Sequence, residues 1–149
     1  MINLIIQFIF AFLGTLGFAI IFNVPAKHMP AASIVGGLGW VVYQISMAAG
    51  SSIPFACFLG ACTVGLFSDI SARMLKQAAT IFVIPGVLPL VPGAGTYYTM
   101  LAIVEGDLAE AGVQGVKTLM MAGAIALGLL VMGTIVQIFR SALDRTKNA

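Results

Sequence analysis

Charged residues are scarce in this chain. Only 8% of its 149 residues are charged, 60% are apolar, and the formal net charge is +2. Soluble domains carry about 25% charged residues, so a water-soluble globule of this composition would expose large apolar patches. The small net charge also excludes the basic surface that nucleic-acid binding needs. We therefore expect an integral membrane protein that contacts the lipid bilayer and no nucleic acid.

Residues typical of metal sites and catalysis are also few. The chain has one histidine, His28, and two cysteines, Cys57 and Cys62. Five residues apart on a helix, the cysteines point about 140° away from each other, which suits neither a redox pair nor a shared metal ion. We expect no enzyme activity, no metal and no cofactor. We interpret His28 as an interfacial loop residue and the two cysteines as packing residues.

Long apolar runs account for the rest of the chain. A transmembrane helix needs about 20 apolar residues, so the chain has room for five helices and for no separate soluble domain. Residues 1–22 lack a basic leading region, and we interpret them as part of an uncleaved first helix. Prolines, glycines and charges divide one all-α transmembrane domain, residues 1–149, into helices over about 3–22, 31–49, 54–72, 77–104 and 117–139, followed by a cytoplasmic tail over 140–149.

The fourth segment, residues 77–104, is longer than one untilted crossing needs. Three prolines and three glycines fall within residues 85–95. Because each proline removes a backbone donor and clashes with the preceding turn, a regular helix cannot continue through them. We predict a discontinuous helix that is broken near 89–95, with arms over about 77–88 and 94–104. A merely kinked helix and a re-entrant hairpin are the alternatives.

The basic residues indicate the orientation in the membrane. With five helices, one side of the membrane holds the first and third connections and the tail, whose basic residues are Lys27, Arg73, Lys76, Arg140, Arg145 and Lys147. The other side holds only Lys117, beside the acidic residues Glu105, Asp107 and Glu110. Since cytoplasmic loops are enriched in Lys and Arg, we expect the N-terminus outside and the C-terminus in the cytoplasm.

No Asp, Glu, Lys or Arg lies near the middle of a predicted span, so chemistry within the membrane would depend on backbone groups. The N-terminus of the second arm carries partial positive charge and can hold a carboxylate near mid-membrane. The candidate binding residues at the break are Pro89, Pro92, Gly93, Gly95, Thr96, Tyr97 and Tyr98. In the alternative interpretation, these groups only stabilise contacts between helices.

Two motifs point to a known family. The first is Phe22-Asn23-Val24-Pro25, and the second runs from Ile84-Pro85 through Pro89-Leu90-Val91-Pro92-Gly93 to Tyr97-Tyr98-Thr99-Met100. Together they resemble the threonine/serine exporter family, and in particular the short membrane subunit of its split form, which includes a succinate-exporting bacterial pair. The resemblance adds Asn23 to the candidate substrate-binding residues. It implies export of small carboxylates across the bacterial inner membrane, together with a larger membrane subunit that has a cytoplasmic domain.

We therefore predict a subunit of a secondary exporter for threonine and serine or for succinate-like dicarboxylates, with the substrate carboxylate at the broken helix. A non-transporting membrane scaffold or assembly subunit is the main alternative. A small homo-oligomeric channel is a third, although the spans show no polar stripe of the kind that lines a pore.

Overall fold

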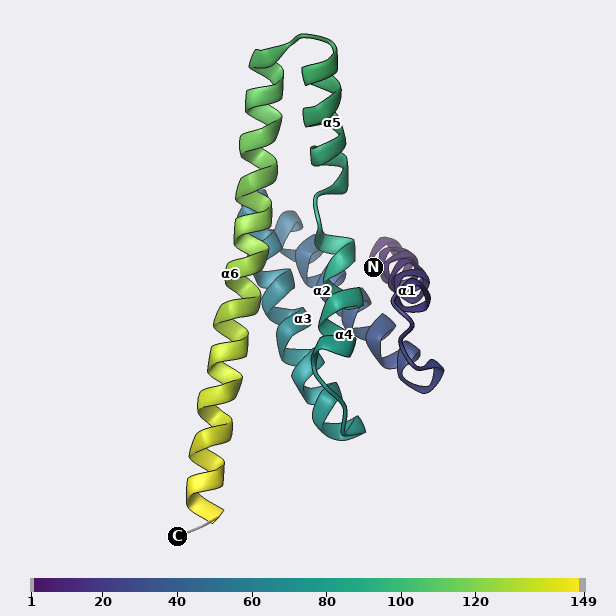
Figure 1. Cartoon of the computed structure of the whole chain (residues 1–149), viewed down its shortest axis with the longest axis vertical. Coiled ribbons are helices and arrows are strands. Elements are labelled where there is room, and N and C mark those ends of the chain that lie inside the picture. The colour runs from purple at the N-terminus through teal and green to yellow at the C-terminus, as the bar shows by residue number, and fades with distance from the viewer. Residues whose placement is uncertain (1, 148–149) are drawn as a thin grey trace.

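The computed structural model describes the backbone of residues 2–147 and the side chains of residues 4–139. Over this range the elements are α1 (Ile2–Ile21), η1 (Ala26–His28), α2 (Met29–Ala48), α3 (Ile53–Leu75), α4 (Thr80–Val87), η2 (Leu88–Leu90), α5 (Gly93–Val104) and α6 (Leu108–Lys147) (Figure 1). Among the described residues, four stretches are long and apolar enough to cross a membrane, and the bent α4–η2–α5 segment makes a fifth if it is one span. The prediction of an all-α membrane protein is confirmed.

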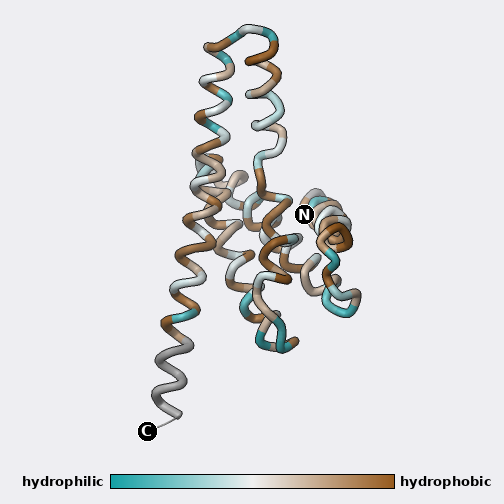
Figure 2. The backbone as a smooth tube through the Cα atoms, in the orientation of Figure 1, coloured by the Kyte–Doolittle hydropathy of each residue, from teal (hydrophilic) through white to brown (hydrophobic). Residues whose placement is uncertain are grey.

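Four helices end in the same way, with one residue in the left-handed conformation. These residues are Asn23 after α1, Gly50 after α2, Lys76 after α3 and Gly106 after α5, with φ angles of 53°, 83°, 52° and 83°. In each case the amide of the following residue donates a hydrogen bond of 2.9–3.1 Å to a carbonyl five residues earlier. These bonds run from Val24 to Ala19, from Ser51 to Ser46, from Gln77 to Ala72 and from Asp107 to Ala102. This motif satisfies carbonyls that the helix end would leave unpaired. Tight turns between helices follow, and Figure 2 shows hydrophilic residues at the turns before α2, α4 and α6.

The first four helices form a bundle in which small residues let backbones approach. α2 packs against both α1 and α3, and α4 packs against α2 and α3. A Cβ atom on Gly37 would lie 2.5 Å from the ring of Phe8 in α1, and one on Gly39 would lie 2.5 Å from Val64 in α3. The larger buried cluster comprises Val35, Cys57, Ala61, Val64, Leu90 and Ile125. The core therefore joins α2, α3, η2 and α6.

The predicted break in the fourth span is confirmed, with narrower bounds. α4 begins at Thr80 rather than near residue 77, because Lys76 starts a turn that uses the residues up to Ala79. The helical path continues through η2 to Leu90, and only residues 91–92 are non-helical before α5 begins. The two arms meet at a bend of 53°. Pro85 lies inside α4, so the actual interruption is the Val91-Pro92 pair.

α6 differs most from its predicted bounds of 117–139. It begins at Leu108, because the Asp107 carboxylate accepts a hydrogen bond of 2.9 Å from the Glu110 amide and caps the first turn. It continues to Lys147, so most of the tail expected over 140–149 is helical, and residues 148–149 lie outside the described part of the chain. Its 40 residues span about 60 Å, twice the hydrocarbon thickness of a bilayer.

α5 leaves the bundle and pairs with the first part of α6, forming a projecting hairpin (Figure 1). Gly95 packs so closely against Thr118 that a Cβ atom would overlap the threonine hydroxyl, and a Cβ on Gly115 would lie 3.4 Å from Thr99. Further along, α6 packs against α3 instead, with Gly128 against Phe58 and Ala61. α6 therefore holds α5 with one half and the bundle with the other.

Candidate functional site

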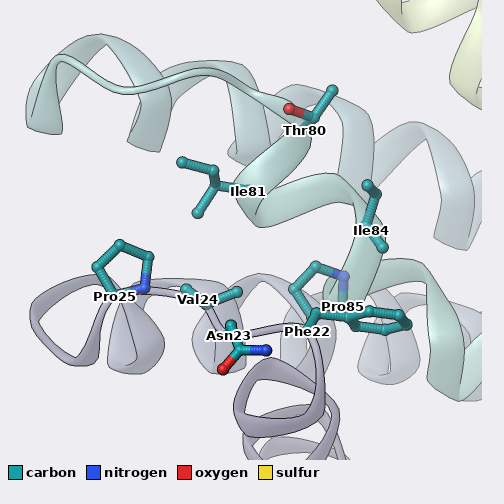
Figure 3. A pocket seen from close by; sticks show the side chains of 8 residues that line it. All are labelled: Phe22, Asn23, Val24, Pro25, Thr80, Ile81, Ile84 and Pro85. Carbon is teal, nitrogen blue, oxygen red and sulfur yellow. The ribbon is translucent and has the colours of Figure 1, made fainter.

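The two sequence motifs meet in a groove between the end of α1 and the first part of α4. Its volume is about 310 Å³, and it is lined by Phe22, Asn23, Val24, Pro25, Thr80, Ile81, Ile84 and Pro85. Figure 3 shows the side chains of Ile81, Ile84 and Pro85 on the α4 side and the turn that follows α1 on the other. Residues about 60 positions apart in the sequence thus form one mostly apolar groove.

The first motif has a structural explanation of its own. Asparagine is one of the few residues that adopts the left-handed conformation readily, and Asn23 does so at the end of α1. Val24 is buried, and Pro25 follows where the helix cannot continue. The motif therefore stops α1 and turns the chain into η1. The Asn23 side chain is exposed and lines the groove, so the same residue remains a candidate for binding.

The second motif weakens α4 along the wall of the groove. Pro85 lies inside α4 and has no amide hydrogen, so the carbonyl of Ile81 lacks its usual partner four residues later. Pro89 does the same to the carbonyl of Pro85. Ile81 and Pro85 both line the groove, and Thr80 adds a hydroxyl at its rim. The backbone of α4 is therefore the more polar part of an otherwise apolar wall.

The break forms a separate candidate site at the start of α5. The Gly93 amide donates a hydrogen bond of 2.8 Å to the carbonyl of Val91, and the Thr96 amide donates one of 3.1 Å to the carbonyl of Pro92. Within the described residues, the amides of Ala94 and Gly95 have no backbone acceptor, and no side chain caps this helix end. Two free amides at a helix N-terminus are suited to binding an anionic oxygen.

The hydroxyl groups near the break differ in availability. Thr96 Oγ1 donates to the carbonyl of Pro92 at 3.2 Å, and Thr99 Oγ1 donates to that of Gly95 at 2.7 Å, so both threonines have used their donors on backbone groups. Tyr97 and Tyr98 lie edge to face with centroids 5.4 Å apart, and they are 62% and 55% exposed. The tyrosine hydroxyls are therefore the accessible donors on α5.

The two glycines at the break have different surroundings. A Cβ atom on Gly93 would meet no atom within 4 Å, so the space beside its backbone is open. A Cβ atom on Gly95 would collide with Thr118 of α6. Gly95 is therefore required for packing of the hairpin whether or not it contacts a ligand, whereas Gly93 has no such requirement.

The predicted site residues fall into two groups. Asn23 lines the groove. The other predicted residues lie outside the groove lining: Pro89 is in η2 just before the break, and Pro92, Gly93, Gly95, Thr96, Tyr97 and Tyr98 lie at or beyond it. Sequence reasoning missed Thr80, Ile81 and Ile84, which line the groove as well, since no local pattern reveals which helix faces the end of α1. It also placed His28 in an interfacial loop, whereas the side chain is 3% exposed and packs against Phe82.

Charged groups gather at the turn between α3 and α4. Arg73 pairs with Asp69 one helical turn away, and both residues line a cavity of about 400 Å³ together with Lys76 and Gln77. Within residues 4–139, no three His, Cys, Asp or Glu side chains come together so as to hold a metal ion. The polar groups of this cavity therefore lie at the end of α4 that is distant from the break.

The sequence matches a known protein family. The family described as "Threonine/Serine exporter, ThrE" matches residues 7–135, a range that includes the groove and the break. The chain belongs to the threonine/serine exporter family. An uncharacterized protein of Haemophilus influenzae (strain Rd) is 30% identical over 106 residues, which make up 70% of this chain and 35% of that relative. The matched part thus spans about a third of the length of this relative. No solved structure matches the chain.

Proposed function

We propose that this chain is one subunit of a secondary exporter that moves threonine and serine or succinate-like dicarboxylates out across the bacterial inner membrane. Membership of the exporter family supports transport as the activity. The chain matches only about a third of its Haemophilus relative, which supports a second, larger membrane subunit that supplies the remaining machinery. The substrate classes share a carboxylate, and this is the group that the proposed site recognises.

The observation that carries the proposal is the unpaired first turn of α5. The free amides of Ala94 and Gly95 would hold the substrate carboxylate, and the open space beside Gly93 would let it reach the backbone. Each hydrogen bond from a backbone amide to a charged acceptor contributes about 1.5–3 kcal/mol. Asn23 and the hydroxyls of Tyr97 and Tyr98 are proposed to contact other parts of the substrate along its path.

The depth of this site follows from its register on α6. Gly95 packs against Thr118, and residues 119–139 of α6 carry no charge. Thr118 lies about 16 Å along the helix from the middle of that uncharged run, compared with a hydrocarbon half-thickness of about 15 Å. A bilayer centred on residues 119–139 would have the first turn of α5 near the boundary of its hydrocarbon layer. There, a helix N-terminus can bind an anion with no ionised side chain.

The basic residues support an orientation with the N-terminus outside and the C-terminus in the cytoplasm. Lys27, Arg73 and Lys76 all lie at the end of the bundle formed by η1 and the turn before α4. The acidic residues Glu105 and Asp107 lie at the tip of the α5–α6 hairpin, at the opposite end. In this orientation the groove faces the cytoplasm, and the break lies toward the outside.

Replacing Gly93 tests the site. Gly93→Leu would put a bulky side chain into the open space where the carboxylate approaches, and its Cβ atom would meet no described atom within 4 Å. Gly112→Leu is the matched control, because Gly112 is also a helical glycine of the hairpin with nothing within 4 Å. Efflux of labelled threonine, serine and succinate is measured in the native host, with each variant replacing the wild-type gene. We expect Gly93→Leu to slow efflux about tenfold or more and Gly112→Leu to preserve it.

Two results would count against the proposal. If Gly93→Leu reaches the membrane and exports at the wild-type rate, the carboxylate does not bind at the break. If deleting the gene alters efflux of none of the three compounds, the chain does not export these substrates, and the scaffold interpretation takes its place.

A further inference from the structure

Two buried polar side chains in the described part of the chain have no hydrogen-bond partner. Within the described residues, the buried side-chain nitrogen and oxygen atoms without a partner are Nδ1 and Nε2 of His28 and Oγ of Ser68. His28 is 3% exposed and Ser68 is 0% exposed. Leaving a buried polar group unpaired costs about 1–3 kcal/mol, so apolar side chains at these positions would give a more stable bundle. These groups are therefore candidates for pairing with a ligand or in another conformation.

His28, in η1, and Ser68, in α3, both face the side of α4 that points toward the core. The His28 ring meets the Phe82 ring edge to face, with centroids 6.1 Å apart. Ser68 lies one turn from Val64 and one turn from Ala72 on α3. A Cβ atom on Gly86 of α4 would lie 3.4 Å from Val64, and Ala72 clusters with Phe82. Ser68 therefore faces α4 between Phe82 and Gly86, on the α3 side.

Phe82 covers this region and is among the largest fully buried side chains. The helix that carries it is short, with a turn before it and the Val91-Pro92 interruption shortly after it. Pro85 removes one of its few hydrogen bonds. The groove along another face of α4 leaves about 310 Å³ beside Ile81 and Ile84, into which the first turns of α4 can tilt. Such a tilt would withdraw Phe82 from His28.

We propose that the core-facing side of α4 is a second binding site for the carboxylate of the exported metabolite, opened when Phe82 moves away from His28 and Ser68. An imidazole N–H and a serine O–H are both donors, and a carboxylate accepts from both. The inference rests on the proposed export function. In the orientation given above, the site lies at the cytoplasmic end, where an exporter loads its substrate.

Stability and transport separate this role from a merely structural one. Ser68→Ala removes an unpaired hydroxyl, so we expect the Tm to stay the same or rise, while the KM of efflux rises about tenfold. His28→Leu should act in the same direction. Ser33→Ala is the control, because Ser33 is equally buried but donates to the carbonyl of Met29 at 2.9 Å. Ser33 lies one turn from Gly37, which packs against α1, so it faces away from α4.

Cysteine labelling tests whether the site opens. Ser68→Cys is placed in a chain that carries Cys57→Ala and Cys62→Ala, in native-host membranes, and is treated with a small polar thiol reagent. We expect labelling that the exported compound slows. In the same background, the labelling rate of Ser33→Cys should be the same with and without substrate.

The outcomes separate this inference from the function on which it rests. If wild-type cells export and Ser68→Ala and His28→Leu leave the KM unchanged, the second site is refuted and the exporter proposal stands. Labelling of Ser68→Cys that substrate does not slow has the same meaning. If wild-type cells export none of the three compounds, the exporter proposal itself fails, and the second site fails with it.

Discussion

The contact between α3 and α6 at Gly128 gives the sharpest test of the fold. A Cβ atom on Gly128 would lie 2.6 Å from the carbonyl oxygen of Phe58, 2.9 Å from the Cβ of Ala61 and 3.3 Å from the amide nitrogen of Cys62. Two of these three neighbours are backbone atoms of α3 and the third is bonded directly to that backbone, so no flexible side chain can move aside. Gly128→Ala must therefore push the two helices apart or fail to pack.

The expected size of the effect follows from this geometry. Overpacking in a well-packed interior costs about 1–3 kcal/mol, which for a chain of this length lowers the Tm by about 2–12 °C. The Cys62 thiol also donates to the carbonyl of Gly128 at 3.5 Å, and this weak bond would be lost as the helices separate. Heating in detergent with a thiol-reactive dye, with every variant in a Cys62→Ala background, reports the transition, because Cys62 is only partly buried whereas Cys57 is fully buried and reacts only when the bundle opens.

Gly133→Ala is the matched control in the same helix. A Cβ atom there would meet nothing within 4 Å, and alanine favours the helix over glycine by about 1 kcal/mol. Its Tm should stay the same or rise. If Gly128→Ala melts together with the wild type and Gly133→Ala, α6 does not approach α3 at Gly128, and the described packing of the last helix is incorrect.

Two further substitutions test other contacts of the bundle by the same thermal assay. Leu90→Ala removes a side chain that is 4% exposed and packs between Gly39 and Gly60, so we expect a loss of about 2–5 kcal/mol, and a loss below 1 kcal/mol would contradict the packing. Trp40→Phe removes the 2.8 Å hydrogen bond from Nε1 to Oε1 of Gln7, which joins α2 to α1, and should cost about 1 kcal/mol. In a Gln7→Ala background the same change should cost less, and equal costs would show that the bond contributes nothing.

Features set by local chemistry could be predicted from the sequence. The apolar runs predicted the spans, and the prolines at 85, 89 and 92 predicted that the fourth one is interrupted. The structure narrows the interruption to Val91-Pro92, because a proline in the first turn of a 3-10 helix, as Pro89 is, needs no amide partner there. The start of α6 was misplaced by hydropathy, since Asp107 and Glu110 begin the helix with polar residues.

Features set by contacts between distant residues could not be predicted. Nothing near Asn23 in the sequence indicates that its turn faces Ile84 and Pro85 of α4, because the pairing depends on how α2 places the two elements. The burial of His28 depends likewise on Phe82, more than 50 residues away. The family resemblance pointed to both motifs, but it could not show that Asn23 and the break belong to different sites.

The packing of Leu90 determines which motion can connect those two sites. Leu90 ends η2 and fits against Gly60, at 3.1 Å from a Cβ atom placed there, and against Gly39 from the other side. An axial slide of α4 would drive this side chain into the backbones of α2 and α3, so sliding is strongly disfavoured. A tilt about Leu90 leaves it in place and carries Phe82, about two turns away, through a larger arc than Pro85 or Gly86. The Val91-Pro92 interruption then prevents α5 from following, because no helical hydrogen bond from the Pro92 nitrogen transmits the rotation. The end of α4 that begins at Thr80 can therefore open while the first turn of α5 stays fixed on α6, which is the independence that alternating access between two sites requires.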